Sequence, residues 1–330
     1  MNSLQDWEKA IRLAASRIEP FVTHTPVVPS PWLSDRLGQS VWLKCEQFQP
    51  MGAFKIRGAA NALIEYCAAD RTSKAVTYST GNHGLAVAHL CRTLGIHGTI
   101  CISQHVPEHK VKKLRELGVQ TVIAGKSQDQ AQRVAEDLVR DQHAHLIAPF
   151  DDPAVIAGQG TIALELLEQV PDLAQVVVPV SGGGLIAGIA AWVKSQRPHV
   201  TIIGVSMERS PVMYESLRLG HPVALPEQET LADSLQGGIG LDNRYTFSMV
   251  QQWVDDVVLV SEAEIVQALV HLALREGLFV EGAAAVAVAW ALRAGHKLSG
   301  PTAIILTGRN ADIAPICRAV NTGIGNILQS

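Results

Sequence analysis

Short apolar runs that alternate with amphipathic stretches constrain the fold of this chain more than any other feature of its sequence. They predict strands at 75–78, 99–102, 119–124, 176–180, 201–205 and 303–306. The stretches around them predict helices at 82–94, 107–117, 128–141, 154–169 and 185–196. Strands that are joined by helices in this way lie parallel in a sheet, and the helices cover both of its faces. The sequence therefore predicts an α/β fold.

Size and charge narrow the classes of function. The 330 residues, of which 47% are hydrophobic, can form two domains or one large domain with a sizeable core. The net charge is −4 and the basic residues are dispersed, so we expect no nucleic-acid surface. The most apolar stretch, 277–292, is rich in alanine and contains Glu281, which is typical of an internal helix rather than a membrane span.

The cysteines and the amino terminus indicate the compartment. The five cysteines are odd in number, widely spaced and without a C-x-x-C pair, as expected for reduced thiols. The amino terminus has no basic start followed by an apolar run, so no signal peptide is predicted. We therefore expect a cytoplasmic protein.

A glycine run separates a predicted strand from a predicted helix. It consists of Gly182, Gly183 and Gly184 after Ser181. Glycine permits left-handed backbone angles, and N–H groups at the start of a helix attract an anion. An ordinary strand-to-helix turn is the alternative. Neither a G-x-x-x-x-G-K-[ST] motif nor a G-x-G-x-x-G motif after the first strand is present, so a single terminal phosphate is expected rather than a pyrophosphate.

Lys55 is the candidate reactive group. Small residues flank it at 52–53 and at 58–60. A solvated surface lysine is the common alternative, but these flanks would let the backbone and a cofactor approach closely. A lysine in such surroundings is neutral often enough to form a Schiff base.

Two polar residues follow predicted strands. Asn82 opens a helix after Gly81 and could cap that helix or bind a ring hydroxyl of a cofactor. Thr307 lies at the strand edge where α/β proteins bind ligands, and its hydroxyl could meet a ring nitrogen or simply end an exposed strand. An amine, an asparagine, a phosphate-sized glycine loop and a hydroxyl together indicate pyridoxal phosphate (PLP) and an enzyme of amino-acid chemistry.

Several segments also occur in an order found in a known family. They are Thr25-Pro26, Leu43-Lys44-Cys45-Glu46, Gly52-Ala53-Phe54-Lys55-Ile56-Arg57-Gly58-Ala59, Ser79-Thr80-Gly81-Asn82-His83-Gly84, Ser181-Gly182-Gly183-Gly184-Leu185 and Glu281-Gly282-Ala283. On these segments the chain resembles, over 18–313, the fold-type II PLP enzymes, and among them the serine/threonine dehydratase group that includes serine racemase.

The resemblance implies a fold and an organisation. The fold is tryptophan synthase β-like, with two open, mostly parallel sheets that have helices on both faces. Residues 1–52 and 148–330 would form a large PLP-binding domain and residues 53–147 a small mobile domain. Family precedent also implies a homodimer or homotetramer.

The resemblance also implies roles for the site residues. Lys55 would hold the cofactor and move the Cα proton, with Phe54 packed beside the cofactor. Asn82 would bind the 3′-hydroxyl, and Thr307 would meet the pyridine nitrogen. The phosphate would be held by Ser181, Gly182, Gly183, Gly184 and Leu185. The pocket for the substrate carboxylate would be shaped by Ser79, Thr80, Gly81 and His83.

The implied reaction removes water from a hydroxyamino acid such as threonine or serine and gives a keto acid and ammonia. Lys55 would act as general base at Cα. Because the neutral hydroxyl of Thr307 should leave the ring nitrogen largely uncharged, elimination is favoured over transamination. An amino-acid racemase is the alternative. A PLP-binding protein without catalysis is a second one, which the intact Lys55, Asn82 and glycine loop disfavour.

The chain departs from the family pattern at a few positions. Thr80 replaces the serine that is the second base of the racemase, which disfavours racemisation. Ser206 replaces the first carboxylate of a divalent-cation site, so we expect no metal site and no strong activation by Mg²⁺ or Ca²⁺. Arg309 and Ser234 stand where glycine is common; Arg309 could anchor the substrate or point to solvent. These changes indicate a specialised substrate and resemble the hydroxyectoine-utilisation dehydratases.

Overall fold

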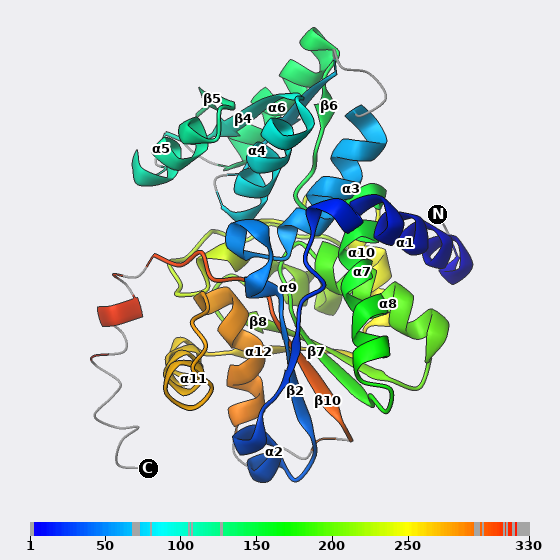
Figure 1. Ribbon diagram of the computed structural model, residues 1–330. Coiled ribbons are helices and arrows are strands. Elements are labelled where there is room, and N and C mark those ends of the chain that lie inside the picture. The colour runs from blue at the N-terminus through cyan, green and yellow to red at the C-terminus, as the bar shows by residue number, and fades with distance from the viewer. Residues whose placement is uncertain are drawn as a thin grey trace.

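Two sheets organise the molecule (Figure 1). The computed structural model describes residues 3–67, 73–79, 81–104, 106, 108–125, 128–293, 298, 300–312, 314, 316–318 and 321. Both sheets have helices packed on either face. The predicted α/β fold with two open, mostly parallel sheets is therefore confirmed.

The larger sheet has six strands in the order β1-β2-β10-β7-β8-β9. Their bounds are β1 Val27–Pro29, β2 Val41–Cys45, β7 Gln175–Pro179, β8 Thr201–Met207, β9 Asp256–Val260 and β10 Thr302–Leu306. β1 is antiparallel to β2, and the other neighbours are parallel. The central strands β7 and β10 are buried along their whole length, as expected for parallel strands under two helix layers.

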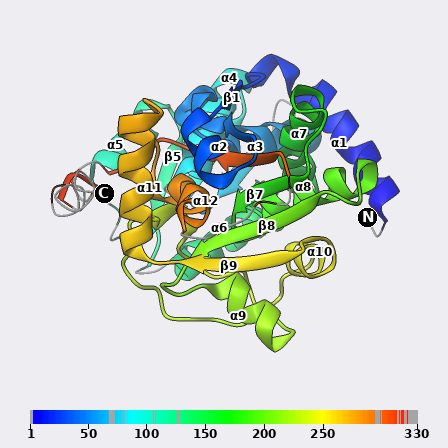
Figure 2. The same cartoon turned by 90° about the horizontal axis from the view of Figure 1, so that it is seen from below.

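Helices cover the two faces of this sheet. One layer consists of α1 Leu4–Ile18, α7 Pro153–Gln169, α8 Gly184–Gln196 and α10 Thr246–Trp253, with α9 Val212–Leu219 beside α10. The other consists of α2 Pro31–Leu37, α11 Glu262–Arg275 and α12 Gly282–Leu292. Figure 2 shows α11 and α12 on one side of the strands and α1 and α8 on the other. α12 lies within the apolar stretch predicted as an internal helix, and its residues from 282 to 291 are buried.

The smaller sheet has four parallel strands in the order β5-β4-β3-β6. Their bounds are β3 Lys74–Thr77, β4 His97–Ile102, β5 Gln120–Ile123 and β6 His145–Leu146. The helices α3 Lys55–Cys67, α4 Asn82–Leu94 and α5 Glu108–Glu116 pack on one face, and α6 Gln128–Gln142 packs on the other. These strands all lie within the range predicted as a small domain; the domain boundaries and the mobility stay predictions.

Short 3-10 turns complete the described structure, at Glu19–Phe21, Glu46–Phe48, Pro50–Gly52 and Asp233–Leu235. Within the described part of the chain, every helix is too short or too polar to traverse a bilayer. The cysteines Cys45, Cys67, Cys91 and Cys101 are buried and free, and Cys317 is exposed and free.

Candidate active site

A cavity of about 1180 Å³ lies where β3, β7 and β10 end. This carboxyl edge is where parallel α/β sheets bind ligands. The cavity is lined by Phe54, Lys55, Ser79, Gly81, Asn82, His83, Ser181, Gly182, Gly183, Gly184, Leu185, Thr307 and Arg309. The structure thus brings together every described residue that the sequence predicted for the site. Thr80 lies outside the described residues.

Lys55 is the first residue of α3 and lines the cavity. Its Nζ donates a hydrogen bond to the carbonyl oxygen of Pro149 at 2.6 Å and lies 5.2 Å from the centre of the Phe54 ring. The N–H of Phe54 donates to the carbonyl oxygen of Thr307 at 3.0 Å, which fixes the start of α3 against the end of β10. Burial lowers the pKa of the Lys55 amine to about 8, although the charge of Glu281 opposes the shift. The neutral, nucleophilic amine is therefore a minority form at neutral pH, but a far larger share than in an ordinary lysine.

The glycines that flank Lys55 lie close to other parts of the protein. A Cβ at Gly58 would lie 2.4 Å from Nε2 of Gln159 on α7. Gly52 has a φ of 76°, and a Cβ there would lie 3.0 Å from Oδ1 of Asn310. The close approach that the sequence predicts at these glycines is therefore present between parts of the protein, a helix and a loop; close approach of a cofactor stays a prediction.

Asn82 is held by side chains, and it is not the cap of α4. Gly81 is the residue before the helix and Asn82 its first residue. Nδ2 of Asn82 donates to the two carboxylate oxygens of Glu281 at 2.8 and 3.1 Å, and Oδ1 accepts from Nδ2 of Asn310 at 2.8 Å. The backbone N–H of Asn310 also donates to Glu281, at 3.1 Å. These bonds fix the orientation of the Asn82 amide in the cavity wall.

Glu281 and Asn310 received no role from the sequence, yet both line the cavity. Burial raises the pKa of Glu281 to about 7, even though the hydrogen bond from Asn82 lowers it. One signal could have identified Glu281. A single carboxylate within an alanine-rich stretch is costly to bury unless polar groups receive it.

The glycine run forms the turn between β7 and α8. Gly183 precedes α8 with a φ of 87°, a left-handed angle that strains any other residue. A Cβ at Gly182 would lie 2.4 Å from the Phe150 ring, and one at Gly183 would lie 2.8 Å from Cε of Met213. The turn therefore brings the start of the 13-residue α8 to the cavity, where helix N–H groups favour an anion.

His83 is buried and neutral. Its Nε2 lies 2.9 Å from the carbonyl oxygen of Ile147. Because a carbonyl oxygen only accepts, Nε2 carries the hydrogen, and Nδ1 has no hydrogen-bond partner among the described residues. Burial and the nearby Lys55 lower the pKa of His83 to about 3. The ring therefore has no free N–H to offer a ligand.

The remaining predicted positions differ in exposure. Thr307 is buried, which rules out the alternative of an exposed strand end. Arg309 is exposed at the cavity, and its backbone N–H donates to the carbonyl oxygen of Gly52 at 2.9 Å. Ser234 is also exposed and lines the cavity. Ser206 is buried in β8, and within the described ranges no group of three or more His, Cys, Asp or Glu side chains is placed to bind a metal.

Known proteins resemble this chain over nearly its whole length. The family described as pyridoxal-phosphate dependent enzyme matches residues 18–308. A putative threonine dehydratase of Sinorhizobium fredii is 44% identical over 98% of both chains. An L-threonine ammonia-lyase of Geobacter sulfurreducens is 40% identical over 95% of this chain and 78% of its own. The structure of maize serine racemase covers 96% of this chain and 98% of its own, with 34% identity and a TM-score of 0.87. This chain therefore belongs to the family of pyridoxal-phosphate dependent enzymes.

Proposed function

We propose that the protein is a PLP-dependent ammonia-lyase that removes water from a β-hydroxyamino acid and yields a keto acid and ammonia. The observation that carries the proposal is the Lys55 amine, which has a lowered pKa in a cavity that Asn82, Thr307 and the glycine loop also line. The similarity to proteins named threonine dehydratase and L-threonine ammonia-lyase supports this reaction class.

The cavity residues fit PLP. The start of α8 and the preceding glycine turn offer N–H donors to a phosphate, and Lys55 offers an amine with a lowered pKa to an aldehyde. We assign the amide of Asn82 to the ring hydroxyl, the hydroxyl of Thr307 to the ring nitrogen, and Phe54 to packing beside the ring. When bound, the cofactor supplies an electron-accepting ring that makes the Cα–H of the amino acid acidic.

The proton transfer belongs to Lys55. Its neutral Nζ takes the proton from Cα of the substrate as general base, and the pKa of about 8 makes this neutral form far more abundant near neutral pH than in an ordinary lysine. The β-hydroxyl then leaves as water together with one proton, which balances the proton that Lys55 took from Cα, and hydrolysis of the released imine by one water gives the keto acid and ammonia. Thr307 carries no charge, so its hydroxyl leaves the ring nitrogen largely unprotonated and favours prompt elimination.

We assign the substrate carboxylate to the start of α4. β3 ends at Thr77 and α4 begins at Asn82, so the first turn of α4 offers backbone N–H groups there. Ser79, Gly81 and the undescribed Thr80 shape this pocket. The contribution of His83 is its backbone N–H, since its ring has no free donor for a carboxylate.

The substrate side chain is assigned to Arg309 and Ser234, which both line the cavity. Arg309 is exposed at the cavity and can anchor an acidic or polar side chain, and Ser234 lies on the same cavity. These two residues support a specialised substrate, such as an amino acid derived from hydroxyectoine. No metal is needed in this assignment, so EDTA should leave activity unchanged.

The organisation of the molecule follows the same proposal. Residues 53–147 form the small mobile domain, and 1–52 with 148–330 form the large PLP-binding domain; the smaller sheet lies within the first range. The enzyme acts in the cytoplasm as a homodimer or homotetramer. The free thiols support a reducing compartment.

Racemisation is the second candidate, because the structure of maize serine racemase matches this chain with a TM-score of 0.87. Incubation with L-serine, followed by chiral chromatography of the amino acid and assay of the keto acid, separates the two. We expect keto acid and ammonia in large excess over D-serine. D-serine as the main product would reject the lyase.

The proposal is tested at Lys55. Purified protein loaded with PLP is reduced with borohydride, digested and mapped by mass spectrometry. The cofactor should be found on the peptide that contains Lys55, and Lys55→Ala should neither retain it nor release ammonia from L-threonine or L-serine. An unmodified Lys55 in the wild type would reject the assignment.

A further inference from the structure

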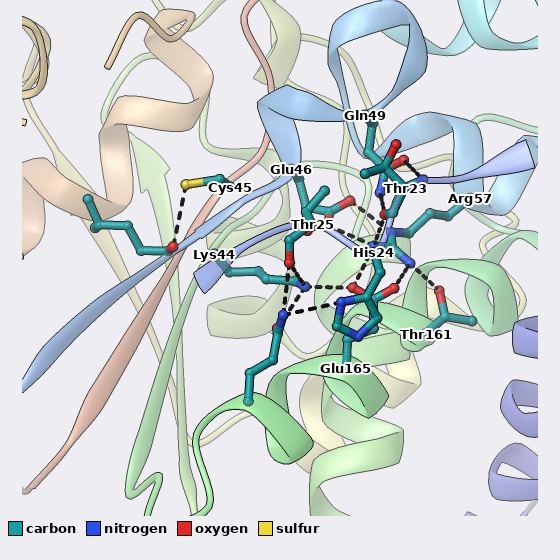
Figure 3. A network of polar contacts seen from close by, with 12 residues as sticks. Thr23, His24, Thr25, Lys44, Cys45, Glu46, Gln49, Arg57, Thr161 and Glu165 are labelled. Carbon is teal, nitrogen blue, oxygen red and sulfur yellow. Dashed lines mark hydrogen bonds and ion pairs between the residues drawn. The ribbon is translucent and has the colours of Figure 1, made fainter. Parts of the chain in front are cut away.

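Several family-like segments also carry side chains that the reaction does not use, and these side chains meet at the start of α3 (Figure 3). The segments contribute Thr25, Lys44, Glu46 and Arg57, and α7 adds Glu165. The five side chains are buried. They pair two cations with two carboxylates, so their formal charges cancel.

Arg57 lies at the centre of this group. Its guanidinium donates to both oxygens of Glu46, at 2.8 and 2.9 Å, and to both oxygens of Glu165, at 2.7 and 3.0 Å. It also donates to Oγ1 of Thr161 at 3.1 Å and to the carbonyl oxygen of Thr23 at 3.3 Å. A planar guanidinium held by two carboxylates in this way has little freedom to move.

The other members complete the hydrogen bonds of the carboxylates. Nζ of Lys44 donates to Glu165 at 2.6 Å and to the carbonyl oxygen of Thr25 at 2.8 Å. The hydroxyl of Thr25 donates to Glu46 at 2.5 Å. Burial alone raises the pKa of Glu46, but the charge and hydrogen bonds of Arg57 outweigh burial and hold that pKa below its ordinary value. Glu46 is therefore ionised, and the pairing is a true ion pair.

These ion pairs hold the same turn of α3 that carries Lys55. Arg57 is two residues further along α3, and residues at this spacing face different sides of a helix. Lys55 consequently lines the cavity while Arg57 enters the ion pairs. The backbones also meet here, since a Cβ at Gly158 of α7 would lie 2.6 Å from the carbonyl oxygen of Arg57. The first turn of α3 is thus held both by its side chain and by its main chain.

We propose that Arg57 is a positioning residue for Lys55: its ion pairs with Glu46 and Glu165 fix the first turn of α3 and thereby hold the Lys55 amine in the cavity wall. Buried ion pairs often add little net stability compared with apolar packing, so a geometric role accounts for their presence here. This inference rests on the proposed function, because it requires Lys55 to bind the cofactor.

The test compares the same exchange at two sites. Arg57→Lys keeps the buried charge but loses the planar fork. Arg293→Lys is the matched control, because Arg293 pairs with Glu264 at 2.6 Å, away from α3. The readouts are the rate at which the apoprotein combines with PLP, followed by absorbance, and kcat and KM for L-threonine or L-serine.

We expect Arg57→Lys to slow combination with PLP and to lower kcat by about tenfold or more, with KM changed by less than about threefold, since a displaced reactive group can cost about 100-fold. Arg293→Lys should match the wild type in both readouts. Equal rates in Arg57→Lys and the wild type would overturn the proposal, as would an equal loss in the control.

If Arg57→Lys does not fold, a second and milder variant tests the proposal. Thr161→Val removes one hydrogen-bond acceptor of Arg57 without leaving a charge unpaired. It should slow combination with PLP by about two- to threefold, in proportion to one lost hydrogen bond; an unchanged rate then overturns the proposal. If borohydride fails to fix PLP on Lys55 in the wild type, the proposed function itself falls. If the wild type is modified and the variants behave like it, only the positioning role falls.

Discussion

At the scale of the residue, two ionisable groups in one cavity have pKa values near neutrality. Burial lowers the pKa of Lys55 to about 8 and raises that of Glu281 to about 7. In both cases the charged form loses hydration; the charge of Glu281 opposes the shift of Lys55, and the hydrogen bond from Asn82 opposes the shift of Glu281. Such paired shifts are typical of catalytic sites.

The pKa of Lys55 predicts a pH profile for the apoprotein. Only the neutral amine attacks the aldehyde of PLP, so the rate of combination should rise with pH through a midpoint near 8 instead of the ordinary value of 10.5. Stopped-flow absorbance across pH 6 to 10 measures it, and Lys55→Ala serves as the blank. A midpoint above about pH 10 would contradict the burial of this amine.

Replacing Glu281 by glutamine predicts a shift in that profile. The Glu281 charge raises the pKa of Lys55, so Glu281→Gln should move the midpoint to lower pH. Glu227→Gln removes an exposed carboxylate from the cavity lining and should leave the midpoint in place. The pH profile of PLP combination is measured for both variants. A midpoint of Glu281→Gln at higher pH than in the wild type would contradict the conclusion that the Glu281 charge raises the pKa of Lys55.

At the scale of the element, α8 depends on its glycine turn. Gly183 precedes α8 with a φ of 87°, and Gly220 follows α9 with a φ of 81°. Both angles are left-handed. The two positions differ in the room for a side chain. A Cβ at Gly183 would lie 2.8 Å from Cε of Met213, whereas a Cβ at Gly220 would have no atom within 4 Å. The comparison separates backbone strain from crowding at the phosphate site.

Alanine substitutions measure this difference. Gly220→Ala should lower the free energy of unfolding by about 1–2 kcal/mol, the cost of a left-handed angle. Gly183→Ala should cost more, about 2–4 kcal/mol, since crowding is added to strain. It should also weaken PLP binding, as measured by titration. Equal losses of unfolding free energy at the two positions, with unchanged PLP affinity, would contradict the assignment of this turn to the cofactor phosphate.

The elements also show what the sequence could and could not predict. Apolar runs and amphipathic stretches were sufficient for β3, β4, β5, β7, β8 and β10 and for α4 to α8, because these signals are local in the chain. β2 was not predicted, since Lys44 interrupts its apolar run and its burial depends on Glu165, which lies far along the chain. The partners of Asn82 were missed for the same reason: Glu281 and Asn310 reach it only through the tertiary fold.

At the scale of the whole molecule, the cavity joins both sheets. β3 of the smaller sheet and β7 and β10 of the larger sheet end at it, and its lining extends from Phe54 to Asp312 in the chain. A ligand that touches all of these walls stabilises the entire fold, because it binds the folded state alone.

This arrangement predicts strong stabilisation by PLP. At a free concentration about a thousandfold above its Kd, PLP should add about 4 kcal/mol to the free energy of unfolding and raise the Tm. Pyridoxal, which lacks the phosphate, should give a smaller rise, because the start of α8 then holds no anion. Differential scanning fluorimetry measures both. Equal shifts for the two compounds would exclude the glycine turn as the phosphate site.

The order of strands in the larger sheet has a consequence for synthesis of the protein. β10 lies between β2 and β7, and it is the last strand in the part of the chain that the structure describes. While the polypeptide is still growing on the ribosome, the inner edges of β2 and β7 have no neighbour, and such bare edges invite aggregation. The larger sheet can close only after residue 306 has left the exit tunnel, so early release of a shortened chain should yield material that depends on chaperones for its solubility.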